Sequence, residues 1–187
     1  MAQAKKKKKF FEVPMNLLNK TTYLYAYEVE DLDGKIIQYD LTRMLKGKSS
    51  LLQLRVKVKG GQVQTFPKKF RILPYFLKRA VRKGTNYVED SFSAQCKDGQ
   101  LRIKPILVTR RKVPRRVRKA LREKAREEII EYVKNKTIEK VFEAVLKLSL
   151  QKHLHPKLKK IYPLSLCEIR VLQVEKENGE GKSSSTN

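Results

Sequence analysis

Apolar and polar residues alternate through much of the first half of the chain, a pattern typical of half-buried β-strands. The alternation is most regular over 51–59, where leucine or valine occupies every second position from Leu52 to Val58. Shorter runs predict further strands over 10–13, 23–29, 35–41, 62–66, 87–97, 99–108 and 166–174. Gly60-Gly61 predicts a two-residue hairpin turn, and Asp98-Gly99 predicts a type I′ turn.

Proline and glycine mark the ends of the first two expected helices. Pro74 is placed to open a short helix that runs through Arg82 and is closed by Gly84. Pro114 is placed in the first turn of a longer helix that reaches about Lys134.

A further helix is predicted in the last third of the chain. Thr137 is a suitable N-cap for it, and Pro156 is expected to break it. The order is therefore several strands, one short helix, a hairpin, two longer helices and a final strand. This order predicts an α+β fold with a mainly antiparallel sheet or a partial barrel, because strands and helices do not alternate strictly.

The expected domain organisation is one folded unit between two tails. Residues 1–9 and 176–187 have the composition of disordered segments. Residues 10–175 are expected to form a single α+β domain, with a β-rich part over 10–109, a helical part over 110–162 and a last strand over 166–174.

The chain is strongly basic, and its charge is concentrated. Its 187 residues carry a formal net charge of +25, and 40% apolar content is enough for one core. Three segments, 5–9, 68–83 and 101–126, carry +5, +7 and +11 of that charge, which leaves only +2 for the rest. Such segregation indicates a surface that binds a polyanion.

The longer helix after Pro114 is predicted to have a cationic face beside an apolar one. At 100° per residue, five cations fall within about 50° of one line: Arg115, Arg118, Lys119, Arg122 and Arg126. About 120° away lie the side chains of an expected core face: Val117, Leu121, Ala125 and Tyr132. An ordinary solvated face would mix both signs of charge, whereas the first three turns here contain almost no acid, which favours a polyanion site.

The predicted nucleic-acid contacts are lysines and arginines from the three basic segments, without Lys124. They are Lys5, Lys6, Lys7, Lys8, Lys9, Lys68, Lys69, Arg71, Lys78, Arg79, Arg82, Lys83, Arg102, Lys104, Arg110, Arg111, Lys112, Arg115, Arg116, Arg118, Lys119, Arg122 and Arg126.

The sequence offers few candidates for catalysis or metal binding. It has no Walker loop, dinucleotide glycine pattern or nucleophile elbow. His153 and His155 stand two residues apart beside Pro156, where helix capping or RNA contact is favoured over a metal. We therefore expect no enzymatic activity, no metal and no cofactor.

The cysteines and the hydropathy of the chain indicate the cellular compartment in which it is expected. Cys96 and Cys167 are expected to be buried thiols in a reducing environment, with one disulfide between them as the alternative. The N-terminal region lacks the apolar core of a signal peptide, and no apolar run reaches the ~20 residues of a membrane span. These patterns predict a cytoplasmic protein with no membrane partner.

RNA fits the basic helix better than DNA does. The helix has no Asn or Gln to read adenine in a major groove, whereas arginine can fork onto phosphates and stack on bases. A free-standing chromatin protein or RNA chaperone remains the alternative function. A membrane-surface module is disfavoured, because Val117 and Leu121 beside the cations are needed for the core.

The order of several short motifs resembles one known family. They are FFEVP at 10–14, GKII at 34–37, KDGQLRIKP at 97–105, TRR at 109–111, IYPL at 161–164 and EIR at 168–170. In this order the chain resembles the archaeal and eukaryotic small-ribosomal-subunit proteins of the S-three-A-e family, also called eukaryotic-type S-one.

The resemblance implies a structural rRNA-bound protein on the platform of the small subunit, near the mRNA exit. Neighbouring ribosomal proteins, and mRNA near the exit, would be its partners, without any cofactor, and the protein would be cytoplasmic and ribosome-bound. By position, the resemblance makes Arg110, Arg111 and the helix cations the strongest candidates for rRNA contact.

Overall fold

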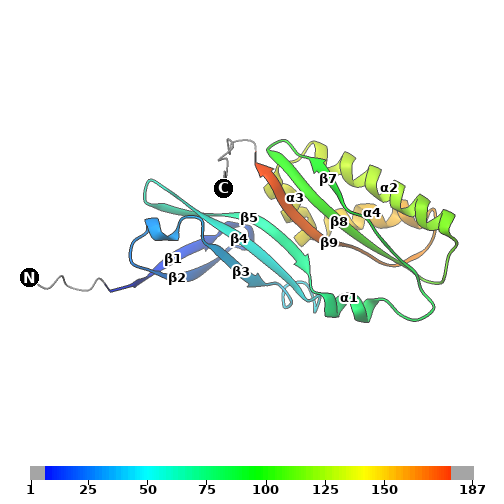
Figure 1. The fold of residues 1–187 in the computed structure, drawn as a ribbon, viewed down its shortest axis with the longest axis horizontal. Helices are drawn as coiled ribbons and strands as arrows, with labels where there is room; N and C mark the ends of the chain where they lie inside the picture. Colours follow the sequence, from blue (N-terminus) through cyan, green and yellow to red (C-terminus); the bar gives the residue numbers. More distant parts are fainter. Residues whose placement is uncertain (1–6, 178–187) are drawn as a thin grey trace, which may run out of the picture.

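The computed structural model, which describes residues 7–177, is an α+β fold with two antiparallel sheets (Figure 1). Strands β1 (Lys9–Met15) and β2 (Lys20–Ala26) pair with each other. A seven-stranded sheet has the order β3-β4-β5-β9-β8-β6, and β7 also pairs with β8. Its strands are β3 (Ile36–Asp40), β4 (Ser50–Lys59), β5 (Gln62–Ile72), β6 (Tyr87–Glu89), β7 (Phe92–Gln95), β8 (Gly99–Thr109) and β9 (Leu164–Glu177). The predicted fold class is confirmed, and the sheets do not close into a barrel.

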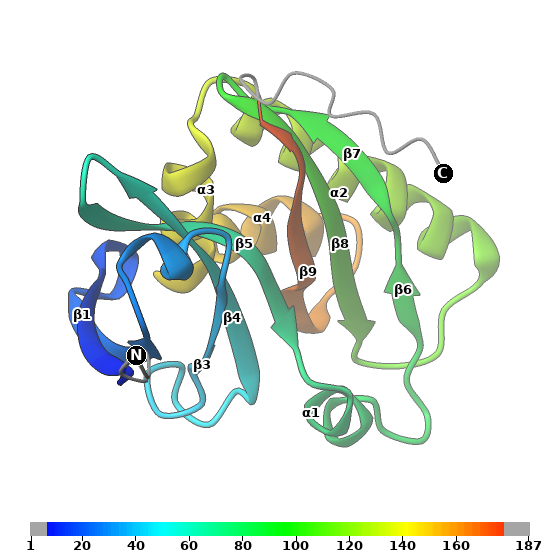
Figure 2. The same cartoon turned by 60° about the vertical axis from the view of Figure 1, so that its left-hand side comes forward.

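Helices lie on one side of the large sheet and leave its other side open. Figure 2 shows α2 (Arg115–Lys134), α3 (Ile138–Leu146) and α4 (Ser149–Lys159) behind the strands, and α1 (Pro74–Ala80) at the end of β5. In β8, Leu101 and Ile103 are fully buried against the helical layer, while the alternating Arg102 and Lys104 retain solvent contact. Successive side chains of a strand point to opposite faces, so these two cations mark the open face.

Several expected elements appear where local chemistry predicts them. Gly60 and Gly61 both have positive φ, +57° and +78°, which glycine adopts without steric cost and which the tight β4–β5 turn requires. Pro114 directly precedes α2, which ends at Lys134 as expected. Strand β5 continues beyond the predicted 62–66 through Pro67, because a register shift against Gln53/Leu54 accommodates the missing N–H.

The helix expected from Thr137 to Pro156 proves to be two helices. Leu148, with φ of +60°, separates α3 from α4, and Pro156 lies inside α4 instead of ending a helix. The break turns α4 so that Leu150, Leu154 and Leu158, at i, i+4 and i+8, are all essentially fully buried. Burial of this apolar stripe outweighs the cost of the proline.

Other boundaries also differ from the sequence pattern. The expected strand 87–97 is interrupted between β6 and β7, and 23–29 is replaced by Lys20–Ala26. The type I′ prediction at Asp98-Gly99 is wrong, since Gly99 lies in β8 without positive φ and the turn spans Cys96 to Gly99. Pro14 is within β1 rather than after it.

Both predicted tails are shorter than expected, because strands β1 and β9 extend into them. Lys9 pairs with Ala26 in β1, and β9 extends through Glu177, two residues into the expected C-terminal tail. The remainder of these predictions, 1–6 and 178–187, lies outside the described residues. Within the described residues, no helix is long and apolar enough to span a bilayer.

Both cysteines are free and buried. Burial raises the pKa of the Cys96 thiol to about 11 and that of Cys167 to about 12. The thiol interpretation therefore holds in this structure, and the alternative disulfide does not.

Candidate nucleic-acid interface

Helix α2 separates apolar from cationic side chains as its sequence predicts. Leu121 and Ala125 are buried in the core, and Val117 is half-buried. Most cations of the predicted stripe are exposed, whereas Arg118 is half-buried. Arg126 is also exposed but lies over the ring of Phe92, 5.4 Å from its centroid, which holds it toward β7.

The cationic start of α2 faces the edge strand β6 across a groove. This groove has a volume of about 800 Å³, and segment 85–89 forms its other wall. Five cations of α2 line it: Arg115, Arg116, Arg118, Lys119 and Arg122. The Nε atom of Arg118 is buried there without a hydrogen-bond partner among the described residues.

A second hollow continues this groove around the end of β6. The sheet edge is interrupted at Asp90-Ser91, between β6 and β7. Here Arg122 from α2 lines the same hollow of about 530 Å³ as Lys104 from β8. Two cations from different layers are thus brought together by a break in the edge of the sheet.

Arg170, which is not among the predicted contacts, also lines this hollow. Its Nη1 donates to both oxygens of Glu89, at 2.8 and 2.9 Å, so its charge is largely neutralised by that carboxylate. Its IRV sequence context on a strand gave no charge run that could have identified it. Asp90, also in the wall, has one carboxylate oxygen buried without a hydrogen-bond partner among residues 7–177.

A third hollow, of about 350 Å³, lies on the α1 side of β6 and includes Lys78. It shares Glu89 with both other hollows, so the three adjoin around β6. We call them together the edge groove. Its basic side chains are Lys78, Lys104, Arg115, Arg116, Arg118, Lys119, Arg122 and Arg170.

Two polar side chains fix the start of α2 beside β6. The Asn86 Oδ1 atom accepts a hydrogen bond from the Val113 N–H at 2.8 Å, just before the helix. The buried Thr109 hydroxyl accepts from the Asn86 N–H at 3.0 Å and lies 2.7 Å from the Arg111 carbonyl oxygen. These bonds join the β8–α2 connection to the segment just before β6. They therefore fix the two walls of the groove relative to each other.

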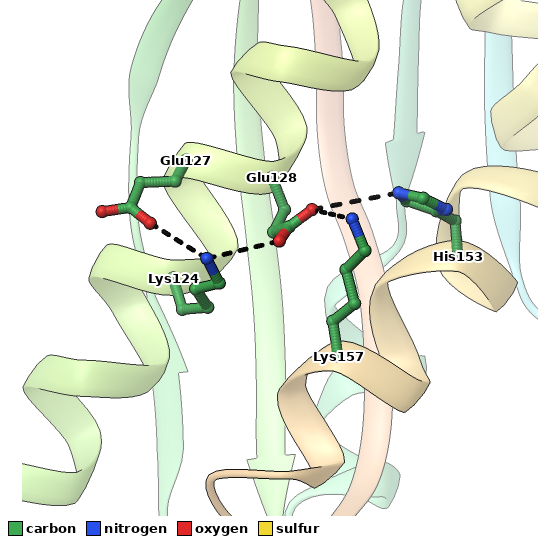
Figure 3. Close-up of polar contacts among 5 residues, drawn as sticks. All are labelled: Lys124, Glu127, Glu128, His153 and Lys157. Atoms are coloured by element: carbon green, nitrogen blue, oxygen red, sulfur yellow. Dashed lines mark hydrogen bonds and ion pairs between the residues drawn. The ribbon is translucent and has the colours of Figure 1, made fainter.

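An ion-pair cluster holds the second half of α2 against α4 (Figure 3). The Glu128 carboxylate is buried and accepts a hydrogen bond from Lys157 of α4, while Lys124 lies 3.4 Å away. These two cations, Lys157 foremost, hold the pKa of Glu128 below its ordinary value of 4.5. His153 Nε2 is 3.9 Å from Glu128, and its ring packs 5.4 Å from Tyr132. The expected position of His153 at a helix end is therefore wrong: it lies within α4 at this helix contact.

The open face of the sheet gathers cations from two of the three basic segments. Gln173 of β9 lies between Lys69 and Arg102, and Val171 lies between Arg71 and Lys104. Directly paired residues share a face, so four predicted contacts stand together: Lys69, Arg71, Arg102 and Lys104. Arg102 is partly neutralised by Glu175, 2.6 Å from its Nε.

The other predicted contacts are exposed but more scattered. Lys68 is in β5, and Arg110, Arg111 and Lys112 form the connection into α2. Arg79 lies 6.0 Å from the rings of both Tyr75 and Phe76. Arg82 and Lys83 follow α1, and Lys7, Lys8 and Lys9 open the β1–β2 sheet, far along the chain from the edge groove. Lys5 and Lys6 lie outside the described residues.

Sequence reasoning also missed a group of exposed aromatic side chains on β1 and β2. Phe10, Tyr23 and Tyr25 are 72%, 64% and 54% exposed. The tyrosine alternation predicted a strand correctly, but it carried no information about which face would be covered.

Comparisons with known proteins give the family of this chain. A family model described as the Ribosomal S3Ae family matches residues 3–178. The small ribosomal subunit protein eS1 of Nanoarchaeum equitans is 26% identical over 156 residues, which cover 80% of this chain and 78% of that protein. The protein of the same name from Halorubrum lacusprofundi is 27% identical over 113 residues, covering 60% of this chain and 53% of that protein.

Proposed function

This chain belongs to the ribosomal S3Ae family and is a small ribosomal subunit protein involved in translation, and from that premise we propose that it binds rRNA through the edge groove and the adjoining open face of the sheet. In this proposal its role is structural, and the RNA is held chiefly through its phosphate backbone.

The observation that carries the proposal is the cationic start of α2. Helix N-termini carry partial positive charge and therefore favour acidic side chains, yet the first turn of α2 holds no acid and no side chain caps it. Arg115, Arg116 and Lys119 add further positive charge there. A bound phosphate would relieve this repulsion and accept hydrogen bonds from the free backbone N–H groups.

The walls of the groove add features that suit RNA. Arginines outnumber lysines in it, and a guanidinium can bind a phosphate with two parallel hydrogen bonds. A phosphate would also supply an acceptor for the buried Arg118 Nε, which otherwise carries the cost of an unpaired polar group. β6 is the outermost strand on this side of the sheet. In the described part of the chain no strand pairs with its outer edge, so its outer backbone groups can meet sugar hydroxyls or phosphates.

The acids Glu89 and Asp90 limit where phosphates can lie. Glu89 sits at the junction of the three hollows, paired with Arg170. Like charge repels a phosphate, so we place the RNA backbone along the α2 wall and over Lys104, away from Glu89. The pattern of charges would thus set the register of the RNA as well as its affinity.

The family resemblance supports four further parts of the proposal. The protein would lie on the platform near the mRNA exit, contact neighbouring ribosomal proteins, contact mRNA, and be ribosome-bound in the cytoplasm. Arg110, Arg111 and Lys112 would extend the RNA contact beyond the groove, since they project from the connection that leads into α2.

Sedimentation and crosslinking test the proposal. The protein should travel with small subunits at moderate salt and be released only at high salt, because phosphate contacts are salt-dependent. Ultraviolet crosslinking in intact cells should attach rRNA to peptides that contain 110–122. A large free pool that binds duplex DNA as tightly as rRNA would instead identify a free-standing nucleic-acid-binding protein.

A further inference from the structure

The small β1–β2 sheet carries an exposed row of aromatic rings on one face. Phe10 is paired with Tyr25, and Glu12 is paired with Tyr23, so these four side chains share a face. The Phe10 and Tyr25 rings contact each other with centroids 4.9 Å apart. Tyr27 follows directly after β2 and is 48% exposed. We call Phe10, Tyr23, Tyr25 and Tyr27 the aromatic ladder.

The opposite face of the same sheet already supplies the core. Val13, Met15 and Ala26 are buried there, and Phe11 and Leu24 pack against the core. The ladder is therefore not needed for folding, and no described element covers it. Four large rings left in water on one small surface indicate a binding site, because apolar groups of this size gain most when they are buried.

The charges beside the ladder favour a nucleic acid as its occupant. Lys8 Nζ lies 5.6 Å from the centroid of Tyr25 and 5.1 Å from that of Tyr27. Lys9, paired with Ala26, lies on the opposite face of the sheet and is not part of the ladder face. Glu12 is the one acid of the ladder face, next to Tyr23. Exposed rings with an ammonium group over two of them suit a strand of RNA, whose bases stack on aromatic faces and whose phosphates attract lysine.

We propose that the aromatic ladder is a stacking platform for unpaired nucleotides of RNA, with Lys8 holding an adjoining phosphate. This inference rests on the proposed rRNA-binding function and adds a second, chemically different contact to it. The edge groove holds backbone by charge, whereas the ladder holds splayed-out bases by stacking. Glu12 keeps phosphates away from the Tyr23 end and so orients the strand.

Substitution of two rings gives the first test. Tyr23→Leu/Tyr25→Leu keeps apolar bulk but removes the π faces, while Tyr23→Phe/Tyr25→Phe keeps the rings as a matched control. The Leu variant should bind an unstructured oligouridylate at least about 10-fold more weakly, and the Phe variant should bind nearly as wild type. Neither change removes a charge, so the salt dependence of binding should not change. The thermal midpoint of each variant shows that folding is intact.

A fluorescence measurement gives an independent test, because the chain contains no tryptophan. Tyr25→Trp places a single indole in the ladder, and Met44→Trp places one between β3 and β4, where Met44 is 46% exposed and lies outside the edge groove. Oligouridylate should quench the indole at 25 strongly and the one at 44 weakly. Equal quenching at both positions would mean that the RNA binds without using the ladder, and would overturn the proposal.

The outcomes separate the two proposals. If the wild-type protein neither binds rRNA nor sediments with small subunits, the proposed function itself fails. If it does both, and the Leu variant matches it on both RNA and subunits, only the ladder proposal fails. If the Leu variant binds RNA normally but no longer joins subunits, the ladder contacts a neighbouring protein, and stacking is refuted.

Discussion

The sharpest prediction concerns four exposed cations of the edge groove. We consider replacing Arg115, Arg116, Lys119 and Arg122 together by glutamine, which keeps length and hydrogen-bonding capacity but removes four charges. Arg118 is left intact because it is half-buried, and Arg126 because it packs on Phe92. This change should weaken RNA binding while making the free protein more stable.

The effect on binding follows from counterion release. Each phosphate neutralised contributes about 0.9 to the slope of log K against log salt on duplex, and about 0.7 on a single strand. Loss of four contacts should therefore flatten the slope by about 3.6 or about 2.8, respectively. Between 50 and 200 mM salt, the variant would therefore lose roughly 100-fold less affinity for RNA than the wild type loses.

The effect on stability has the opposite sign. Arg115 and Arg116 lie in the first turn of α2, where each positive charge costs about 0.3–1 kcal/mol against the helix dipole. The lost Lys119–Glu123 pair, 3.7 Å apart and exposed, offsets only about 0.3 kcal/mol. A net gain of about 1 kcal/mol should raise the thermal midpoint of the free protein by about 2–4 °C.

The control removes the same number of charges elsewhere. Lys35, Lys59, Lys140 and Lys152 are exposed and lie outside the edge groove, so their replacement by glutamine tests whether net charge alone drives binding. Fluorescence anisotropy with an rRNA fragment gives the slope for both variants, and calorimetry gives the midpoints. An equal slope change in both variants, or an unchanged slope in the groove variant, would refute the assignment of the groove.

Three further predictions concern the supports of this surface. Glu128→Gln should lower the free energy of unfolding by about 1–2 kcal/mol at neutral pH, because Lys157 loses a charged acceptor. Folding lowers the pKa of Glu128 from 4.5, so the stability that the carboxylate contributes is present above that value and is lost as pH falls through the lowered pKa. Urea titrations of the variant and the wild type should therefore converge in acid. Cys96 and Cys167 should react with a thiol reagent at pH 8 only after denaturation, since their pKa values are about 11 and 12; rapid labelling of the folded protein would contradict their burial. Asn86→Ala should lower the free energy of unfolding by about 1–2 kcal/mol and speed hydrogen exchange of the Val113 N–H, because that N–H loses its acceptor. Unchanged exchange would show that this bond does not hold the start of α2.

The sequence by itself determined much of the local structure. Gly60-Gly61 specified a tight turn because only glycine adopts two successive positive φ values at low cost. Pro114 and the apolar spacing of Leu121 and Ala125 specified where α2 begins and which face it buries. These features depend on residues a few positions apart, so the chain order alone contains them.

Tertiary packing decided the features that local patterns left open. The left-handed turn at Leu148 and the helical Pro156 exist because the leucine stripe of α4 must reach the core, a gain that no local propensity expresses. The tyrosines of β2 alternate like any half-buried strand, and only the absence of a described covering element leaves their rings in water.

For the candidate site too, the sequence determined some features and the tertiary structure decided others. Charge runs in the sequence indicated the cations of α2 and β8, because like charges crowded along one segment need a counterion wherever the segment lies. Only the fold could show that Arg122 and Lys104 line one hollow at the Asp90-Ser91 break, or that the paired Arg170 and Glu89 line it too. Residues far apart in the chain meet through sheet register and helix docking, and these are set by burial of the whole core.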